Sequence, residues 1–310
     1  MMKKTYLSLI AVAALAISSC KEKAPNVKLT EDTAKDTTYA SGTIPAAQPR
    51  NVLVEEYTGA SCTNCPAAHE VLKDYQKDHV GRINVIGLYI KGPIQTVPPN
   101  SPHAAAYDFR HDDATSIAKD IYGGVNSLPS AGIDRLPANG NLKQDRSIWA
   151  SSIEAGLATP DSINLSLEST LDSSTGMATV VATITYPMAI TFAHNLNLVL
   201  VQDSIIDVQE YPSNDPVHPG GDENYVFTNV LRAVLTSLPG GDPIYANVPA
   251  KEPGRVVIRV YKYDTKKLGE RTVNPAKQPA MVAGHCRIIG YISAASGAYR
   301  IMQSAQTTLK

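Results

Sequence analysis

The sequence predicts an α/β domain followed by an all-β sandwich, and three observations support this. The motif Cys62-Thr63-Asn64-Cys65 stands between an apolar stretch and an amphipathic one. Before Pro160, buried strands alternate with segments of helical periodicity, which is typical of βαβ units. After Pro160 the apolar residues recur at every second position, and turn residues separate the segments. Short alternating strands of this kind are typical of an antiparallel sandwich.

The N-terminus resembles an export signal with a lipid attachment site. Two lysines precede an apolar stretch from Tyr6 to about Ile17, which is too short to span a bilayer as a stable helix. Small residues then precede Cys20, as in a bacterial lipobox. The resemblance implies cleavage after residues 1–19, lipid on the thiol and amine of Cys20, and membrane attachment through that lipid. An ordinary signal peptide with a coincidental cysteine is the alternative.

The next residue favours one membrane over the other. Lys21 stands where an inner-membrane retention signal usually has Asp, so we expect a lipid-anchored protein of the outer membrane, on its periplasmic or its surface side. Residues 20–48 are polar and rich in Lys, Asp, Thr, Ala and Pro, which predicts a flexible tether.

Charge and cysteine content exclude some classes of protein. The chain has 28 basic and 29 acidic residues, two of the lysines lie in residues 1–19, and the remaining net charge is therefore about −3. Nucleic-acid binding needs a basic surface, so we expect no such partner. In an oxidising compartment cysteines tend to pair. With lipid on Cys20, three cysteines remain, too few for a disulfide framework.

The predicted α/β domain covers residues 49–159 and begins with a βαβ unit. Val52-Leu53-Val54 predicts a buried strand, and Pro66 suits the first turn of a helix. Residues 83–90 are almost continuously apolar, as in a parallel strand covered on both faces.

The rest of this domain shows two more helical patterns and one turn signal. Helices are expected over residues 114–122 and 146–157, the second with Asp145 as its cap. Between them, Asn139-Gly140 is typical of a hairpin turn.

The predicted sandwich covers residues 160–310. Alternating strands are expected over residues 163–167, 180–184, 196–200, 256–260, 285–293 and 299–309. Residues 205–253 look irregular, with a short helix or strand between Tyr225 and Leu235. Cys286 has the same parity as Ile288 and Ile292, so it should point into the sandwich core as a small apolar group.

Residues 50–158 resemble thioredoxin-like domains in their order of strand, C-x-x-C, helix, strand, insertion, helix, X-Pro, strand, turn and helix. Pro129 falls where that fold has a cis-proline, which lies beside the dithiol and offers backbone to a substrate peptide. Glu56 falls where thioredoxins have a buried carboxylate that accepts a proton. A strand-end carboxylate below the next turn can take a proton from the second thiol. The alternative places Glu56 at the solvent end of the strand. Glu55 faces the other way on the strand and should be exposed.

This sequence also departs from thioredoxins. Ser61 replaces the tryptophan before the first cysteine, and Thr63-Asn64 replaces the Gly-Pro pair between the cysteines. The insertion before Pro129 is long. These departures alter the surface that thioredoxins use for electron transfer.

The whole chain is similar to a narrower group, the family of the twenty-eight-kilodalton outer-membrane lipoprotein of the Bacteroides group. The resemblance rests on the lipobox, the run Glu55-Glu56-Tyr57-Thr58-Gly59 before the C-x-x-C, the Leu-Pro loop, the run from Val230 to Arg232, and the Cys-Arg-Ile-Ile-Gly-Tyr-Ile strand. It implies a thioredoxin-like domain followed by an immunoglobulin-like one. Surface exposure and adhesion have been suggested for the family.

Two functions follow. In the first, the chain is a thiol–disulfide oxidoreductase in which Cys62 attacks, Cys65 resolves, Glu56 manages the second proton and Pro129 shapes the groove, with protein thiols or disulfides as partners. In the second, it is a lipoprotein that binds a surface protein or glycan, with a static C-x-x-C.

Other chemistry is weaker, and we expect no cofactor and no metal. A four-residue disulfide loop stabilises a fold only slightly. A zinc site would need more ligands than His69 adds, and Pro66 stands where covalent haem needs a histidine. His103 and His111 are expected to be inert surface residues. The loop with Asp215, His218, Asp222 and Glu223 does not have EF-hand spacing, and we expect it to be solvated.

Overall fold

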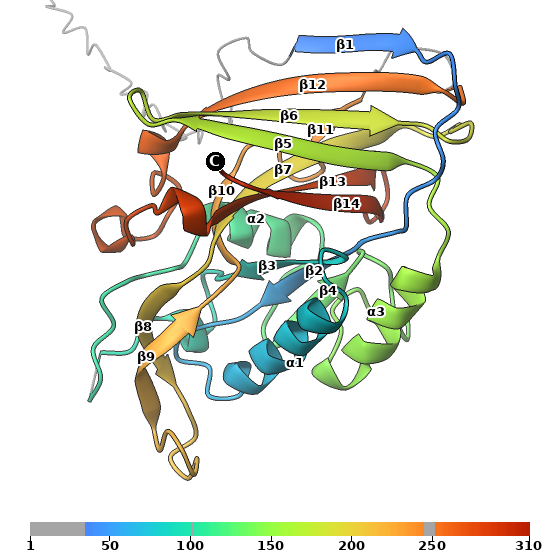
Figure 1. The fold of residues 1–310 in the computed structure, drawn as a ribbon. Helices are drawn as coiled ribbons and strands as arrows, with labels where there is room; N and C mark the ends of the chain where they lie inside the picture. The colour runs from blue at the N-terminus through green and yellow to red at the C-terminus, as the bar shows by residue number, and fades with distance from the viewer. Residues whose placement is uncertain (1–34, 101, 245–251) are drawn as a thin grey trace, which may run out of the picture. The chain divides into compact units, whose positions relative to one another are not determined.

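The computed structural model describes residues 35–100, 102–244 and 252–310, and within this part of the chain β-strands outnumber α-helices (Figure 1). Residues 1–19, Cys20 and the first part of the expected tether lie outside the described residues. The helices are α1 (Cys65–Asp78), α2 (Asp112–Asp120) and α3 (Trp149–Ala158). The strands are β1 (Lys35–Ala40), β2 (Val52–Tyr57), β3 (Ile83–Leu88), β4 (Ser130–Ile133), β5 (Asn164–Asp172), β6 (Met177–Thr185), β7 (His194–Gln202), β8 (Ile205–Glu210), β9 (Gly221–Phe227), β10 (Val230–Val234), β11 (Asp242–Pro243), β12 (Arg255–Asp264), β13 (Cys286–Ala294) and β14 (Ile301–Thr308).

One sheet runs through both predicted domains. Its order is β14-β13-β7-β10-β3-β2-β4, with β11 beside β7. Strands β2 and β3 are parallel and β4 is antiparallel to β2, while β10 pairs in parallel with β3 and antiparallel with β7. The short strand β10 therefore joins the α/β part to the β-rich part, and the sheet crosses the boundary expected at residue 160.

The two faces of this sheet bury different cores. On one face, apolar side chains of β2, β3, β7, β10 and β13 pack with those of α2 in one continuous cluster. On the other face, α1 and α3 cover β2, β3 and β4. Beyond them, on the β-rich half, side chains of β7 and β13 pack against the second sheet. Cys286 is fully buried in this last cluster, which confirms its expected position.

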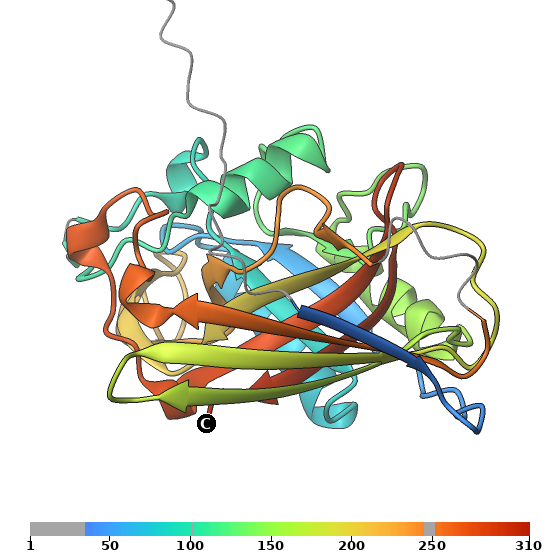
Figure 2. The same ribbon diagram turned by 90° about the horizontal axis from the view of Figure 1, so that it is seen from above.

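The second sheet has the order β1-β12-β6-β5 and is antiparallel throughout (Figures 1 and 2). Its edge strand β1 pairs from Lys35↔Val260 to Ala40↔Arg255. Residues 35–40 were expected to belong to a flexible tether, and in the structure they are a strand. A polar segment such as Asp36-Thr37-Thr38 suits an edge position, where one side of the strand faces solvent.

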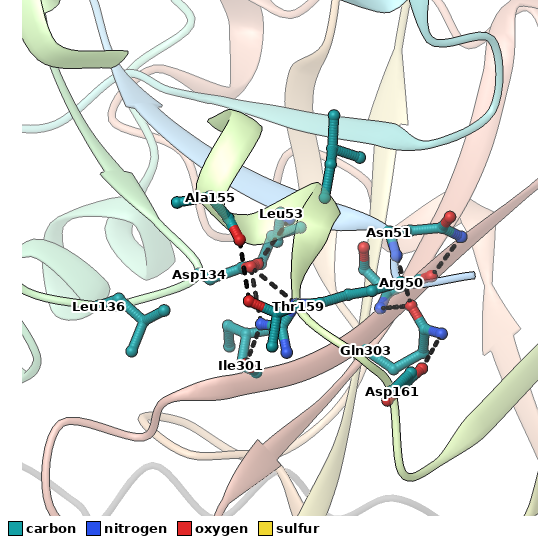
Figure 3. A network of polar contacts seen from close by, with 12 residues as sticks. Arg50, Asn51, Leu53, Asp134, Leu136, Ala155, Thr159, Asp161, Ile301 and Gln303 are labelled. Atoms are coloured by element: carbon teal, nitrogen blue, oxygen red, sulfur yellow. Dashed lines mark hydrogen bonds and ion pairs between the residues drawn. The ribbon is translucent and has the colours of Figure 1, made fainter. Parts of the chain in front are cut away.

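Polar side chains tie the start of β2 to the β-rich part (Figure 3). Arg50 Nη2 donates to Asp134 Oδ2 at 2.7 Å and to the Ile301 carbonyl at 2.8 Å, and the side chain is 2 % exposed. Gln303 of β14 donates to Asp161 and accepts from the Asn51 backbone N–H. These bonds join segments on both sides of residue 160, so the two parts of the chain share a polar core as well as an apolar one.

Local predictions agree with the structure in the α/β part. The expected strands and helices are present within a few residues of their predicted bounds. Asn139 and Gly140 have φ values of 51° and 76°, as a hairpin turn of this type requires. Asp145 accepts from the Ser147 N–H and caps the short 3₁₀ turn that leads into α3.

Candidate functional site

The C-x-x-C motif lies where β2 ends and α1 begins, as expected. Cys62 and Cys65 form a disulfide with a Cα–Cα distance of 5.3 Å. The Cys65 N–H donates to the Cys62 carbonyl, and the Cys62 N–H donates to Gly59. Helix α1 starts with Cys-Pro-Ala-Ala, an uncharged first turn, so no side chain there offsets the positive end of the helix dipole. This end favours a thiolate when the pair is reduced.

A segment after β3 packs closely against the turn before the motif. The Ser61 N–H donates to the Gln95 carbonyl and Ser61 Oγ donates to the Val97 carbonyl at 2.7 Å. A Cβ on Gly59 would lie 2.2 Å from the Gln95 oxygen, so glycine is required there. Beside this contact, a hollow of about 330 Å³ is lined by Ser61, Ile94, Gln95, Val97, Pro98, Pro99, Asn100 and Glu210.

The β8–β9 hairpin, residues 205–227, packs against the turn that carries Cys62. Gln209 is fully buried, and its Nε2 donates to the carbonyls of Cys62 at 3.1 Å and Gly59 at 3.3 Å. The Glu210 N–H donates to the Ala60 carbonyl at 2.8 Å. Cys62 is only 2 % exposed and Cys65 is fully buried, while the residues between them are exposed.

The sequence did not indicate this hairpin. Its strands pair in a sheet of their own, and one of its cross-strand pairs, Ile206 and Val226, is exposed. Residues 211–220 between the strands contain three prolines, which suggested an irregular region. The inward contacts depend on partners more than 100 residues away, so no local pattern could reveal them.

Glu56 is the buried carboxylate of the site. It is 4 % exposed, and burial raises its pKa from 4.5 to about 8. Within the described residues, no donor hydrogen-bonds to its Oε1. Sequence reasoning left open whether this side chain would face solvent, and the structure places it inside. A carboxyl with a pKa near neutrality can both take up and release a proton.

His69, on α1 four residues after Cys65, lies next to Glu56. Its Nε2 is 3.5 Å from Glu56 Oε1 and 2.8 Å from Thr58 Oγ1. Its Nδ1 is 2.6 Å from the hydroxyl of Tyr225 on β9. Burial lowers the pKa of His69 to about 4, so the ring is neutral at neutral pH. The sequence identified this histidine only as an insufficient metal ligand, because its partner on β9 is distant in the chain.

Glu55 does not point to solvent, and that expectation was wrong. It is 1 % exposed and binds Arg135 through two bonds, Nε–Oε2 at 2.9 Å and Nη2–Oε1 at 2.7 Å. Tyr122 donates a third bond to Oε2 at 2.5 Å. Both faces of β2 are covered, so alternation along this strand separates two buried environments and leaves no solvent side.

Pro129 follows a cis peptide bond with Leu128, directly before β4. Its neighbour Ser130 pairs with Tyr57 at the end of β2 that leads to the motif, and Glu56 pairs with Ala131. Pro129 is half-buried. The Pro129 loop therefore lies beside the end of β2 at which the dithiol turn begins.

The remaining candidates take structural positions. His111 was expected at the surface but is buried, where its Nδ1 accepts from the Asp113 N–H and caps α2. His103 Nδ1 lies 2.5 Å from Glu223 on the hairpin. Among the residues that the structure describes, no group of three His, Cys, Asp or Glu side chains could hold a metal ion. None of the helices in the described ranges has the length and apolar character to cross a membrane.

Comparison with known proteins gives information on the fold alone. No family model matches the chain, and no curated protein matches it in sequence. The solved structure of HBP35 of Porphyromonas gingivalis matches with a TM-score of 0.56 over 86 % of this chain and 77 % of that one, at 14 % identity. A protein of Agrobacterium tumefaciens matches with a TM-score of 0.48 over 85 % and 96 %, at 9 % identity, which is too slight to support an argument. The chain shares its fold with HBP35, and the Cys62–Cys65 disulfide within it fits a thioredoxin-like protein.

Proposed function

We propose that the chain is a thioredoxin-like thiol–disulfide oxidoreductase of the cell envelope, with Cys62 and Cys65 as its redox pair. The observation that supports this most is Glu56, a carboxyl buried at the end of β2, just before the dithiol turn. Its Oε1 accepts no hydrogen bond from the described residues, and burial raises its pKa to about 8. Such a group is costly to the fold and is typical of acid–base chemistry. The helix that begins at Cys65 supplies the complementary feature, a terminus that favours a thiolate.

The proposed reaction in the reducing direction has two steps. The Cys62 thiolate attacks a disulfide, one S–S bond breaks, and a thiolate leaves while a mixed disulfide forms. Cys65 then gives its proton to the Glu56 carboxylate and attacks Cys62 Sγ, which releases the second thiolate. The substrate is reduced by two electrons and the protein ends with the Cys62–Cys65 disulfide. The oxidising direction is the reverse, and Pro129 borders the substrate in both.

The lipoprotein part of the proposal rests on the sequence. Cleavage before Cys20 and lipid on that residue would hold the protein on the outer membrane, and the Bacteroides lipoprotein family remains the proposed relation. The substrates would then be thiols and disulfides of envelope proteins or small molecules.

The burial of the dithiol favours a second candidate function. Because Cys62 is only 2 % exposed and Gln209 binds its carbonyl, the disulfide can be static in a protein that binds a surface protein or glycan. Such a protein would need no reactive thiol.

Trapping of the mixed disulfide separates the two functions. Reduced Cys65→Ser protein should form a stable adduct with hydroxyethyl disulfide at Cys62, detected by its mass, because no second thiol remains to release it. The matched variant Cys62→Ser should react far more slowly. If Cys65→Ser protein reacts no faster than free cysteine at pH 6, the oxidoreductase is excluded and the static disulfide remains.

A further inference from the structure

Tyr225 reaches the dithiol site from a strand 156 positions after His69 in the chain. Its hydroxyl contacts His69 Nδ1 at 2.6 Å, and the other ring nitrogen faces Thr58 Oγ1 at 2.8 Å and Glu56 Oε1 at 3.5 Å. A continuous row of polar contacts therefore leads from the buried carboxyl, through the imidazole, to the hairpin.

The chemistry of these groups decides where the ring proton lies. A neutral imidazole has one N–H donor and one acceptor nitrogen. Burial raises the pKa of Tyr225 far above neutrality, so its hydroxyl keeps a hydrogen to donate. When the phenol donates to Nδ1, the ring hydrogen is on Nε2 and faces Thr58 and Glu56. The opposite tautomer would turn a lone pair toward the carboxylate, which is unfavourable whenever Glu56 is ionised.

We propose that Tyr225 is a positioning residue of the dithiol site, which holds His69 as the Nε2–H tautomer and thereby supports the ionised form of Glu56. This inference rests on the proposed function, because Glu56 must be ionised to take the proton of Cys65. In the second step the S–H proton of Cys65 moves to the Glu56 carboxylate. Cys65 then bonds to Cys62, the substrate sulfur leaves as a thiolate, and Glu56 later returns its proton to solvent.

The β8–β9 hairpin thus contributes twice to the site. Gln209 of β8 binds the Cys62 turn, and Tyr225 of β9 binds the histidine beside the carboxyl. The β-rich part of the chain therefore sets the proton-transfer step of a reaction whose sulfur atoms belong to the α/β part.

Several other polar side chains lie near Glu56 and Tyr225. Glu56 is faced by His69 from α1, by Tyr89 after β3 and by Tyr225 from β9. Tyr225 is also near Tyr211, Glu70 and Asp222. The variant Tyr225→Phe would keep the ring contacts with Phe227 at 4.8 Å and Tyr211 at 6.3 Å between centroids, and would remove only the hydroxyl.

The experiment follows the two steps separately. Reduced protein is mixed with hydroxyethyl disulfide from pH 5 to 10, and both the formation of the mixed disulfide and the release of the second thiol are timed. In Tyr225→Phe we expect the second step to be about three- to tenfold slower at pH 7, with its pH midpoint displaced upward, and the first step unchanged. Tyr211→Phe removes a neighbouring hydroxyl that does not bind His69, and it should behave as the wild type.

His69→Gln provides a second test if Tyr225→Phe folds poorly. His69→Gln has no tautomer to select, so it should displace the same midpoint upward, and adding Tyr225→Phe should displace it no further. An unchanged midpoint in either single variant, or additive displacements in the double variant, overturns the role of Tyr225. A wild-type protein that reacts at neither step overturns the proposed function instead.

Discussion

Glu55 and Glu56 are neighbours on β2, and both are buried, yet their surroundings differ completely. Glu55 accepts two bonds from Arg135 and one from Tyr122. Glu56 is on the opposite face of the strand, within 3.5 Å of a neutral histidine, and one of its oxygens has no hydrogen bond from the residues that the structure describes. The carboxylates point to opposite sides because successive strand side chains do so.

A buried glutamate can therefore serve two purposes, depending on the side chains around it. A buried carboxylate that is bound by Arg and Tyr side chains joins the elements that carry them and specifies how they pack. A carboxyl without such partners changes its protonation state easily, at a cost to stability. The first belongs to the core shared by both parts of the chain, and the second to the dithiol site.

The largest expected effect comes from breaking the Glu55 pair. Arg135→Met should destabilise the fold by about 3–5 kcal/mol, because it leaves a buried carboxylate without its cation. The double variant Glu55→Leu with Arg135→Met should recover much of this loss. Urea unfolding measures both, and a single variant as stable as the wild type would contradict the structural role of the pair. The pH dependence of thiol exchange should not change in folded protein.

Glu56→Gln should stabilise the fold, whereas Arg135→Met should destabilise it. The folded pKa is raised from 4.5 to about 8, so the folded state binds more protons between these values, and stability of the wild type falls as pH rises from 4.5 to 8. The variant carries no titrating proton there and escapes this loss. It should be more stable than the wild type by on the order of 4 kcal/mol above pH 8, with no gain near pH 4.

Unfolding in urea at pH 5 and pH 8.5 tests this for the disulfide form. The same difference between Glu56→Gln and the wild type at both values would show that Glu56 does not titrate as proposed. The variant should also slow the second step of thiol exchange, so that stability and activity change in opposite directions.

Gln209→Ala has the smallest expected effect, and that effect is on the access of reagents to the Cys62 thiol. It removes the donor to the Cys62 and Gly59 carbonyls, so the reduced Cys62 thiol should react with iodoacetamide about tenfold faster, equivalent to the loss of one hydrogen bond. Ile206→Thr on the exposed face of the same strand is the control. If both variants react at the wild-type rate, the hairpin does not limit access to Cys62.

Much of the α/β part could be predicted from the sequence, because its signals are local. The buried strand from Val52, the helix after Pro66 and the turn at Asn139 each follow from a few adjacent residues. The C-x-x-C pair was placed by its position between a buried strand and a helix, and Pro129 by the resemblance to thioredoxin-like domains.

The other features of the fold and the site depend on contacts between residues that are far apart in the chain. The burial of Glu55 requires Arg135, which is 80 positions away, and the contact of His69 requires Tyr225. Strand β10 links the two halves of the long sheet, and its five residues carry no local sign of that pairing. Sequence periodicity gives the face on which a side chain lies, whereas the element that covers that face is known only from the structure.

The reduction potential of the Cys62–Cys65 pair tests the central claim most directly. Equilibration of the wild-type protein with a glutathione or dithiothreitol buffer, read by thiol labelling, gives the value. A working dithiol predicts a potential between about −120 and −270 mV, the range of thiol–disulfide oxidoreductases. A value below about −300 mV would identify a static disulfide and contradict the proposed function.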